Sequence, residues 1–167
     1  MSKTMLLLRH GKSDWASGET EDLQRPLNKR GRKSSRAMGR LIAECGLIPD
    51  LVLCSIAVRA RDTLDEATRA GAWSAETRLH EELYGADVSG LVELARSVPA
   101  EHGRVLIVGH EPTLSELIAS LCGGAAVHFP TAALAGIECA VPEWAGVGAG
   151  CGVLQWLVTP RLLVGGG

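Results

Sequence analysis

Three short apolar runs constrain the fold of this chain more than any other feature. They occupy residues 5–8, 51–54 and 105–108, and each contains four consecutive apolar residues. A run of this length is short for a buried helix, and its lack of polar alternation is typical of a strand covered on both faces. Each run is followed, directly or after a polar loop, by a segment with helical periodicity. This order predicts an α/β fold, a three-layer α/β/α sandwich with a mostly parallel central sheet.

Hydrophobic periodicity and helix-capping residues predict the remaining elements. Helices are expected at residues 28–45, 57–70, 88–97 and 112–121. A short strand is expected at 77–79, and strand-like runs at 132–141 and 153–158 are expected to form a hairpin that completes the sheet. The length of 167 residues suits one domain over 1–167 with a substantial core.

Charge and composition narrow the partners and the location. The formal net charge of −2 argues against a nucleic-acid-binding surface. A basic cluster at 29–33, continued by Arg36 and Arg40, is interpreted as a solvated helix face, with attraction for an anionic protein partner as the alternative. No apolar stretch approaches the ~20 residues that span a membrane. Five cysteines without CxxC spacing indicate reduced thiols and a cytoplasmic protein.

Cationic and nucleophilic residues stand just beyond the three apolar runs. Arg9 and His10 follow the first run, Ser55 and Arg59 follow the second, and His110 follows the third. Parallel strands place their carboxyl ends at one edge of a sheet, where ligands bind, so these residues are expected to converge. Cations packed together are costly when desolvated, and a phosphoryl group compensates them with negative charge and three acceptor oxygens. The sequence therefore predicts a phosphate-binding site.

Four motifs occur in order along the chain, namely 8–15 (LRHGKSDW), 22–31 (DLQRPLNKRG), 55–63 (SIAVRARDT) and 108–112 (VGHEP). Together they resemble the histidine phosphatase superfamily, whose fold is phosphoglycerate mutase-like, and within it the SixA-type phosphohistidine phosphatases. Their order and spacing agree with that family over residues 5–160. The resemblance implies that His10 is the nucleophile and is transiently phosphorylated. It also implies that Arg9, Arg59 and His110 bind the phosphoryl oxygens, without a metal ion or another cofactor.

Two further positions in these motifs have alternative interpretations, and a third departs from the family pattern. Ser13 is a candidate for phosphate binding or caps its loop. Arg25 either steers the substrate or pairs with Asp22. Ile56 stands where the family usually has proline, and we expect only a small backbone adjustment because Ser55 and Arg59 keep their spacing.

The general acid is less determined than the nucleophile. Larger family members protonate the leaving oxygen with a glutamate four residues before a glycine, which points to Glu81 ahead of Gly85. Glu82 is adjacent, and for either glutamate the alternative is an ordinary surface carboxylate. An imidazole leaving from phosphohistidine needs less proton donation than an alkoxide. The short stretch 81–110 also leaves little room for a lid, and both points favour phosphohistidine as substrate.

The preferred function is therefore a protein phosphohistidine phosphatase whose partner is a phosphorylated protein. The alternatives are a small-molecule phosphomonoesterase of the same superfamily and a non-catalytic module that binds a phospho-ligand. No cysteine has an arginine six positions on, as cysteine phosphatases require, and residue 6 is leucine where a P-loop needs glycine. The other histidines (His80, His102, His128) are expected at surface or loop positions. The four tryptophans (Trp15, Trp73, Trp144, Trp156) are expected to be packing residues.

Overall fold

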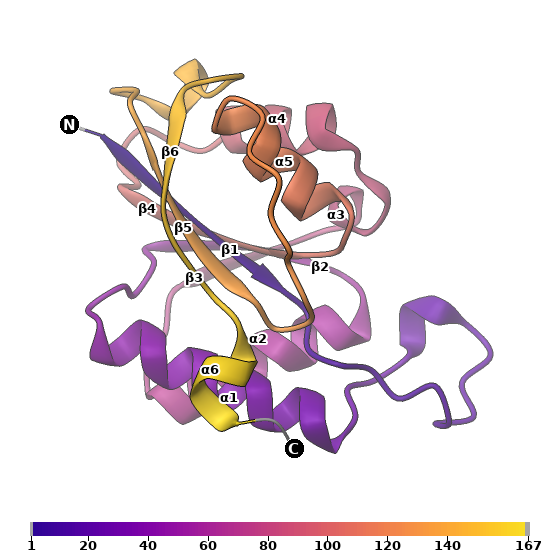
Figure 1. The fold of residues 1–167 in the computed structure, drawn as a ribbon. Coiled ribbons are helices and arrows are strands. Elements are labelled where there is room, and N and C mark those ends of the chain that lie inside the picture. The colour runs from indigo at the N-terminus through magenta and orange to yellow at the C-terminus, as the bar shows by residue number, and fades with distance from the viewer. Residues whose placement is uncertain (1, 166–167) are drawn as a thin grey trace.

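A six-stranded sheet forms the centre of the computed structural model, which describes residues 2–165 (Figure 1). The strands are β1 (Lys3–Arg9), β2 (Leu51–Ser55), β3 (Glu76–His80), β4 (Arg104–Gly109), β5 (Leu134–Cys139) and β6 (Gly152–Val158). They lie in the order β3-β2-β4-β1-β5-β6. Pairing is parallel from β3 to β1, whereas β5 is antiparallel to both β1 and β6. The mostly parallel sheet and the closing hairpin are confirmed.

Helices cover both faces of this sheet (Figure 1). One layer contains α1 (Lys29–Glu44), α2 (Val58–Gly71) and α6 (Pro160–Val164). The other contains α3 (Glu82–Gly85), α4 (Val88–Arg96) and α5 (Thr113–Leu121), and two short 3-10 helices occur at Asp22–Gln24 and Trp144–Gly146. The predicted three-layer sandwich is confirmed. The sequence patterns did not reveal α3 and α6, because single turns of four and five residues carry too little periodicity.

The uninterrupted apolar run of β1 supplies two separate cores. Met5 and Leu7 pack in the cluster that includes residues of α4 and α5, and Leu6 and Leu8 pack in the cluster beneath α1 and α2. All four side chains are fully buried. Because successive strand residues point to opposite faces, only a strand covered on both sides needs apolar residues at every position. The same pattern therefore determines both the layer arrangement and the position where β1 ends.

Three of the four tryptophans are buried or partly buried, and the fourth corrects the prediction. Trp73 and Trp144 lie in the two cores, and Trp156 packs partly buried against one of them. Trp15 is 81% exposed, so its interpretation as a packing residue is wrong. It lies in the polar loop after β1, and the guanidinium of Arg25 stacks 3.5 Å from its ring centroid. The loop leaves the body of the protein there, so no apolar layer is available to cover the ring.

The close approach of α1 and α2 depends on Gly39. A Cβ atom at this position would overlap the backbone of Ala67. We expect Gly39→Ala to lower the free energy of unfolding by about 1–3 kcal/mol, because overpacking forces the two helices apart. Gly90→Ala in α4 is the matched control. Its Cβ would meet no atom closer than 3.5 Å. We therefore expect Gly90→Ala to raise the free energy of unfolding by about 0.5–1 kcal/mol, because alanine is favoured over glycine inside a helix. Urea denaturation of both variants measures the difference, and equal stability of the two would contradict the packing argument.

None of the helices described between residues 2 and 165 is both long enough and apolar enough to cross a membrane.

Candidate active site

A cleft of about 430 Å³ opens at the carboxyl ends of β1, β2 and β4. Arg9 of β1 pairs with Gly109 of β4. The next residues of the two strands, His10 and His110, therefore lie side by side at the edge of the sheet. The cleft is lined by Arg9, His10, Lys12, Ser13, Trp15, Arg25, Arg30, Arg59, His110, Glu111 and Thr131. It brings together six of the seven residues expected at the site, and the seventh, Glu81, lies outside it.

His10 is held as a neutral imidazole with one free nitrogen. Its Nδ1 lies 2.7 Å from the backbone oxygen of Gly11. A carbonyl oxygen only accepts hydrogen bonds, so Nδ1 carries the proton and Nε2 keeps its lone pair. Burial lowers the pKa of His10 to about 3, and the charges of His110, Arg59 and Arg9 act in the same direction. A neutral imidazole of this kind is a ready nucleophile near neutral pH.

The backbone around His10 is fixed from three sides. The backbone N–H of His10 donates to the oxygen of Gly109 at 3.1 Å, and its backbone oxygen accepts from Ala132 at 3.0 Å. The N–H of Gly11 donates to the hydroxyl of Thr63 at 2.8 Å. That hydroxyl in turn donates to the backbone oxygen of Arg59 at 2.7 Å. Thr63 thus connects the segment that carries the nucleophile to the first turn of α2.

His110 lies against His10 and is oriented by the end of β2. The two ring centroids are 5.2 Å apart. The Nε2 atom of His110 is 2.8 Å from the hydroxyl oxygen of Ser55, which also accepts from the backbone N–H of Ala57 at 3.2 Å. Burial, followed by the charge of Arg59, lowers the pKa of His110 to about 4. Ile56 therefore does not prevent Ser55 from contacting this histidine.

Three arginines surround the two histidines. Arg9 donates to the backbone oxygen of Phe129 at 3.1 Å, and burial lowers the pKa of its guanidinium. Within the described residues, the buried Nε atoms of Arg9, Arg25 and Arg59 have no hydrogen-bond partner, nor does Nδ1 of His110. Unpaired buried donors are rare in proteins and each costs free energy. An anion rich in acceptor oxygens is the class of ligand that suits such a group of donors.

Asp22, which the sequence analysis names only as a possible partner of Arg25, contacts three side chains beside the cleft. Its carboxylate accepts from Nη2 of Arg25 at 2.6 Å, from Nη2 of Arg59 at 3.0 Å and from the Tyr84 hydroxyl at 2.7 Å. Its backbone oxygen accepts from Nη1 of Arg59 at 2.8 Å. The hydrogen bond from Tyr84, followed by the hydrogen bond from Arg25 and the charges of Arg59 and Arg25, holds the pKa of Asp22 well below its usual range. Asp22 therefore joins three separate segments at the rim of the cleft.

Ser13 and Arg25, the two loop residues with alternative interpretations, both line the cleft and contact each other. Arg25 pairs with Asp22, and it also lines the cleft. Ser13 is buried, lines the cleft and accepts a hydrogen bond from Nη1 of Arg25. Its position therefore suits phosphate binding and loop support together.

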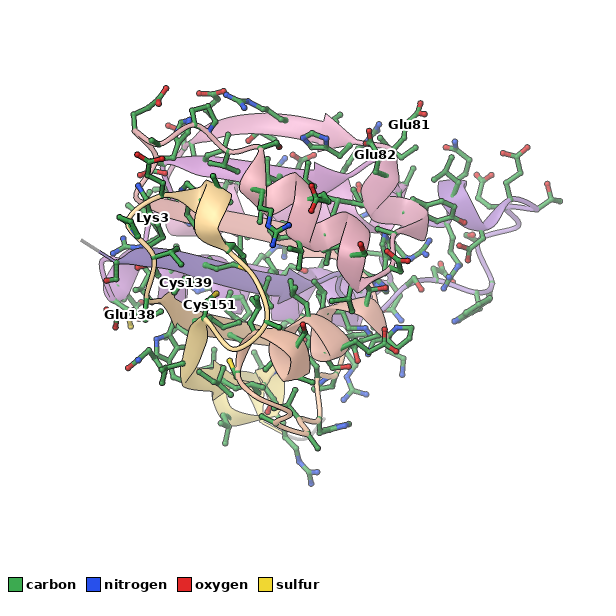
Figure 2. The ribbon with its side chains drawn as sticks, turned by 90° about the horizontal axis from the view of Figure 1, so that it is seen from above. Lys3, Glu81, Glu82, Glu138, Cys139 and Cys151 are labelled. Atoms are coloured by element: carbon green, nitrogen blue, oxygen red, sulfur yellow. The ribbon has the colours of Figure 1, made fainter. Side chains whose placement is uncertain are left out.

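The glutamates expected to supply the general acid, Glu81 or Glu82, do not line the cleft. Glu81 and Glu82 are exposed, point away from the body of the protein and line a separate hollow beside α3 (Figure 2). Glu111 is the acidic residue that lines the cleft. Its carboxylate accepts from the backbone N–H of Ser115 at 2.8 Å and from the Ser115 hydroxyl at 2.7 Å. Its place directly after His110 was visible in the sequence, but no spacing rule marked it.

The remaining histidines lie outside the cleft. His128 is exposed in a loop, as expected, and His102 lies in a loop but is buried there. His80 corrects the expectation in part, because it is the last residue of β3 rather than a loop residue. None of the three lines the cleft.

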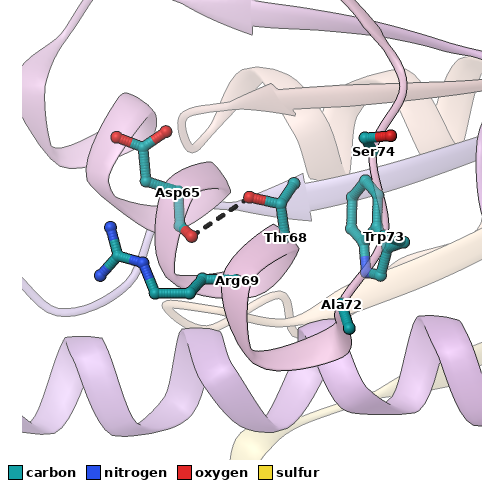
Figure 3. Close-up of a pocket in the computed structure, with 6 residues that line it drawn as sticks. All are labelled: Asp65, Thr68, Arg69, Ala72, Trp73 and Ser74. Carbon is teal, nitrogen blue, oxygen red and sulfur yellow. Dashed lines mark hydrogen bonds between the residues drawn. The ribbon is translucent and has the colours of Figure 1, made fainter.

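A different hollow, at the carboxyl-terminal end of α2, offers no comparable chemistry (Figure 3). Its walls include Asp65, Arg69 and Trp73 and contain no histidine or cysteine. The Thr68 hydroxyl there donates to the backbone oxygen of Asp65 at 3.2 Å, so it supports its own helix. Among residues 2–165 no cluster of histidine, cysteine and carboxylate side chains has the composition of a metal site.

A neutral histidine beside several arginines, at the edge of the sheet where parallel strands end, is an arrangement suited to phosphoryl transfer. The chain belongs to the histidine phosphatase superfamily (branch 1), whose family model matches residues 5–103. That match contains Arg9, His10 and Arg59 and ends before His110. An uncharacterised protein of Mycobacterium tuberculosis is 39% identical over 165 residues, which cover 92% of this chain and 100% of the relative. A 2,3-bisphosphoglycerate-dependent phosphoglycerate mutase of Clavibacter michiganensis is 38% identical over 91 residues, 50% of this chain and 36% of the mutase.

Solved structures extend the similarity over the whole site. The protein histidine phosphatase SixA complexed with tungstate has a TM-score of 0.82 and 26% identity, covering 96% of this chain and 99% of that structure. A provisionally assigned phosphohistidine phosphatase SixA from Nakamurella multipartitia has a TM-score of 0.79 and 29% identity, covering 96% and 97%. These matches support the SixA-type resemblance of the sequence motifs and confirm the phosphoglycerate mutase-like fold.

The lowered pKa values of His10 and His110 predict an acid-sensitive fold. Between about pH 6.5 and pH 4 the unfolded chain binds protons that the folded chain excludes, so stability is present above this window and is lost as the pH falls through it. We expect His110→Gln to reduce the slope of unfolding free energy against pH by up to about 1.4 kcal/mol per pH unit. Urea denaturation between pH 4.5 and 7 measures this slope. His128→Gln, which replaces an exposed histidine, is the control, and equal slopes in the two variants would contradict the prediction.

Proposed function

We propose that this chain is a protein phosphohistidine phosphatase that works through a phosphorylated His10. Nε2 of His10 attacks the phosphorus atom, the new N–P bond forms, and the bond to the substrate imidazole breaks. The imidazole leaves with its proton as a neutral ring. Water then attacks the phosphorylated His10, inorganic phosphate departs, and the neutral histidine is restored. The observation that carries the proposal is the hydrogen bond from Nδ1 to the Gly11 oxygen, which leaves Nε2 free beside the arginines.

The arginines and His110 are assigned to charge stabilisation. Phosphoryl transfer depends mainly on positioning and on compensating the negative charge of the transferred group. Arg9, Arg59 and His110 lie around His10 with donors suited to phosphoryl oxygens, and Ser13 and Arg25 lie on the same wall of the cleft. We infer that these five residues bind the substrate phosphoryl group.

The position of the acidic residues favours a nitrogen leaving group over an alkoxide. Glu81 lies outside the cleft, and the carboxylate of Glu111 is already bound to Ser115. An alkoxide needs a proton donor as it leaves, whereas a phosphorylated imidazole departs readily. The second candidate is a small-molecule phosphomonoesterase, with Glu111 as its acid, because Glu111 is the carboxylate in the cleft.

The two candidates differ in substrate preference. A missing general acid is expected to cost a phosphoester about 10²–10⁴-fold in rate. We therefore expect kcat/KM for a histidine-phosphorylated peptide to exceed that for 3-phosphoglycerate by at least about 10²-fold. The variant Glu111→Gln separates the candidates further. If the protein is a phosphomonoesterase with Glu111 as its acid, this variant loses activity on the phosphoester and keeps its activity on the peptide. A higher kcat/KM for the phosphoester than for the peptide would overturn the proposal.

The proposed partner is a phosphorylated protein, and the proposed location is the cytoplasm. The exposed Trp15 at the mouth of the cleft is consistent with an approach by a macromolecule. The five cysteines, without CxxC spacing, suit a reducing compartment. We treat residues 1–167 as one histidine phosphatase domain.

A further inference from the structure

A second, smaller hollow adjoins the cleft and shares three of its wall residues, Lys12, Arg30 and Thr131. Its volume is about 260 Å³. The rest of its lining comes from α1, from the loop before β5 and from the start of α6: Ser34, His128, Pro130, Thr159, Pro160 and Arg161. The cleft and this hollow are therefore neighbouring compartments that share part of their walls.

The charged side chains that line the second compartment are all basic. Lys12, Arg30, His128 and Arg161 contribute to its walls, and we call this set the basic groove. No aspartate or glutamate is among the residues that line it. The ion pairs found among residues 2–165 do not include Lys12, Arg30 or Arg161.

Two other arginines of α1 are neutralised by a neighbour, whereas Arg30 is in none of the ion pairs found among residues 2–165. Arg32 and Arg36 both pair with Glu66 of α2, at 3.0 and 2.5 Å. The basic cluster of the sequence is thus divided by the fold, with one part in salt bridges and Arg30 at the groove. Positive groups gathered without a carboxylate attract an anionic ligand and repel cationic ones.

We propose that the basic groove binds an acidic side chain of the same protein segment whose phosphohistidine occupies the cleft. This inference rests on the proposed function and adds a sequence preference to it. The two compartments are adjacent and share wall residues, so an extended segment that places its phosphohistidine in the cleft can reach the groove with a neighbouring side chain. Small-molecule sites usually enclose most of their ligand. At the mouth of this cleft, in contrast, Trp15 is 81% exposed, which favours a protein segment.

Pairs of histidine-phosphorylated peptides provide the test. Each pair carries glutamate or glutamine at one position within four residues of the phosphohistidine, and the histidine is phosphorylated with phosphoramidate. We expect wild-type protein to hydrolyse the glutamate peptide with about 2- to 5-fold higher kcat/KM at one or two positions, the range of an exposed ion pair. Added salt is expected to remove the preference, because exposed charges are screened.

Arg161→Glu is the diagnostic variant, because Arg161 lines the groove and not the cleft. We expect it to abolish or invert the preference for glutamate while leaving hydrolysis of phosphoramidate, which carries no second anionic group, unchanged. Arg69→Glu, an exposed arginine at the far end of α2, is the matched control and is expected to retain the preference.

The inference would be overturned by the absence of a glutamate preference in wild-type protein, by equal losses on both peptides in Arg161→Glu, or by the same change in Arg69→Glu. An Arg161-dependent advantage for a small bisphosphate, without one for the peptides, would also overturn it. Failure of the proposed function is distinguishable, because the protein would then hydrolyse neither phosphoramidate nor any phosphohistidine peptide.

Discussion

Replacing His10 with alanine is expected to lower the turnover of a phosphohistidine peptide by at least about 10³-fold, because the attacking atom is lost. His10→Ala removes Nε2 and leaves Arg9, Arg59 and His110 in place. The protein should therefore still bind inorganic phosphate. Initial rates and phosphate inhibition of residual activity, or phosphate binding by calorimetry, measure the two effects separately.

Trapping the intermediate makes this prediction specific to the nucleophile. Phosphate bound to a histidine nitrogen is released by acid and survives alkali. Wild-type protein quenched during turnover is expected to carry such a phosphate, and His10→Ala none. His80→Ala is the matched control, since His80 ends β3, much as His10 directly follows β1, but lies outside the cleft. Undiminished turnover in His10→Ala would refute the assigned nucleophile. Phosphate binding without any turnover by wild-type protein would favour a non-catalytic phospho-ligand module.

Loss of Arg59 is expected to produce the second largest effect. Arg59 is buried beside His10 and fixed to Asp22 by two hydrogen bonds. Removing one donor that stabilises transition-state charge costs about 2.7–4 kcal/mol, so Arg59→Ala should lower kcat/KM by about 10²–10³-fold. Arg59→Lys is expected to restore only part of the activity, because an ammonium keeps the charge but not the planar fork.

The neighbouring helix position supplies the control for Arg59. Arg61 lies two residues further along α2 and is exposed. We expect Arg61→Ala to stay within about 2-fold of wild type, as exposed charges contribute little. Thermal unfolding checks that Arg59→Ala remains folded, and Asp22 keeps Arg25 and Tyr84 as partners in that variant. A loss below about 10-fold, or equal losses at both positions, would contradict the role assigned to Arg59.

The residues that the sequence placed correctly are those at the ends of buried strands. Arg9, His10 and His110 follow apolar runs whose lengths are visible locally, and parallel pairing brings their ends to one edge. Arg59 follows in the first turn of the helix after β2. Sequence separation is irrelevant to this convergence, because the sheet register determines it. For this reason the convergence of these residues in one cleft was predictable before any contact was known.

The contacts that the sequence missed are made through loops. Asp22 and Tyr84 meet across 62 positions, and no period or cap connects them. Glu81 was favoured by its spacing from Gly85, yet the single turn of α3 directs it to a different hollow. Trp15 was expected in a core, and the projecting loop exposes it instead. In each case the direction of a side chain depends on a loop path that hydrophobic patterning does not encode.

The sequence by itself determined the α/β/α architecture, the family and the edge of the sheet where His10 lies. These properties follow from burial. A strand that is apolar at every position must be covered by helices on both faces. The apolar run ends at the edge of the sheet where ligands bind in this class of fold. Only the tertiary structure decided which charges meet, including the partners of Asp22, the carboxylate in the cleft and the basic groove. Exposed ion pairs contribute about 0.2–1 kcal/mol each, too little to impose a pattern on the sequence. Their arrangement is therefore a consequence of the folded loops and becomes visible only in three dimensions.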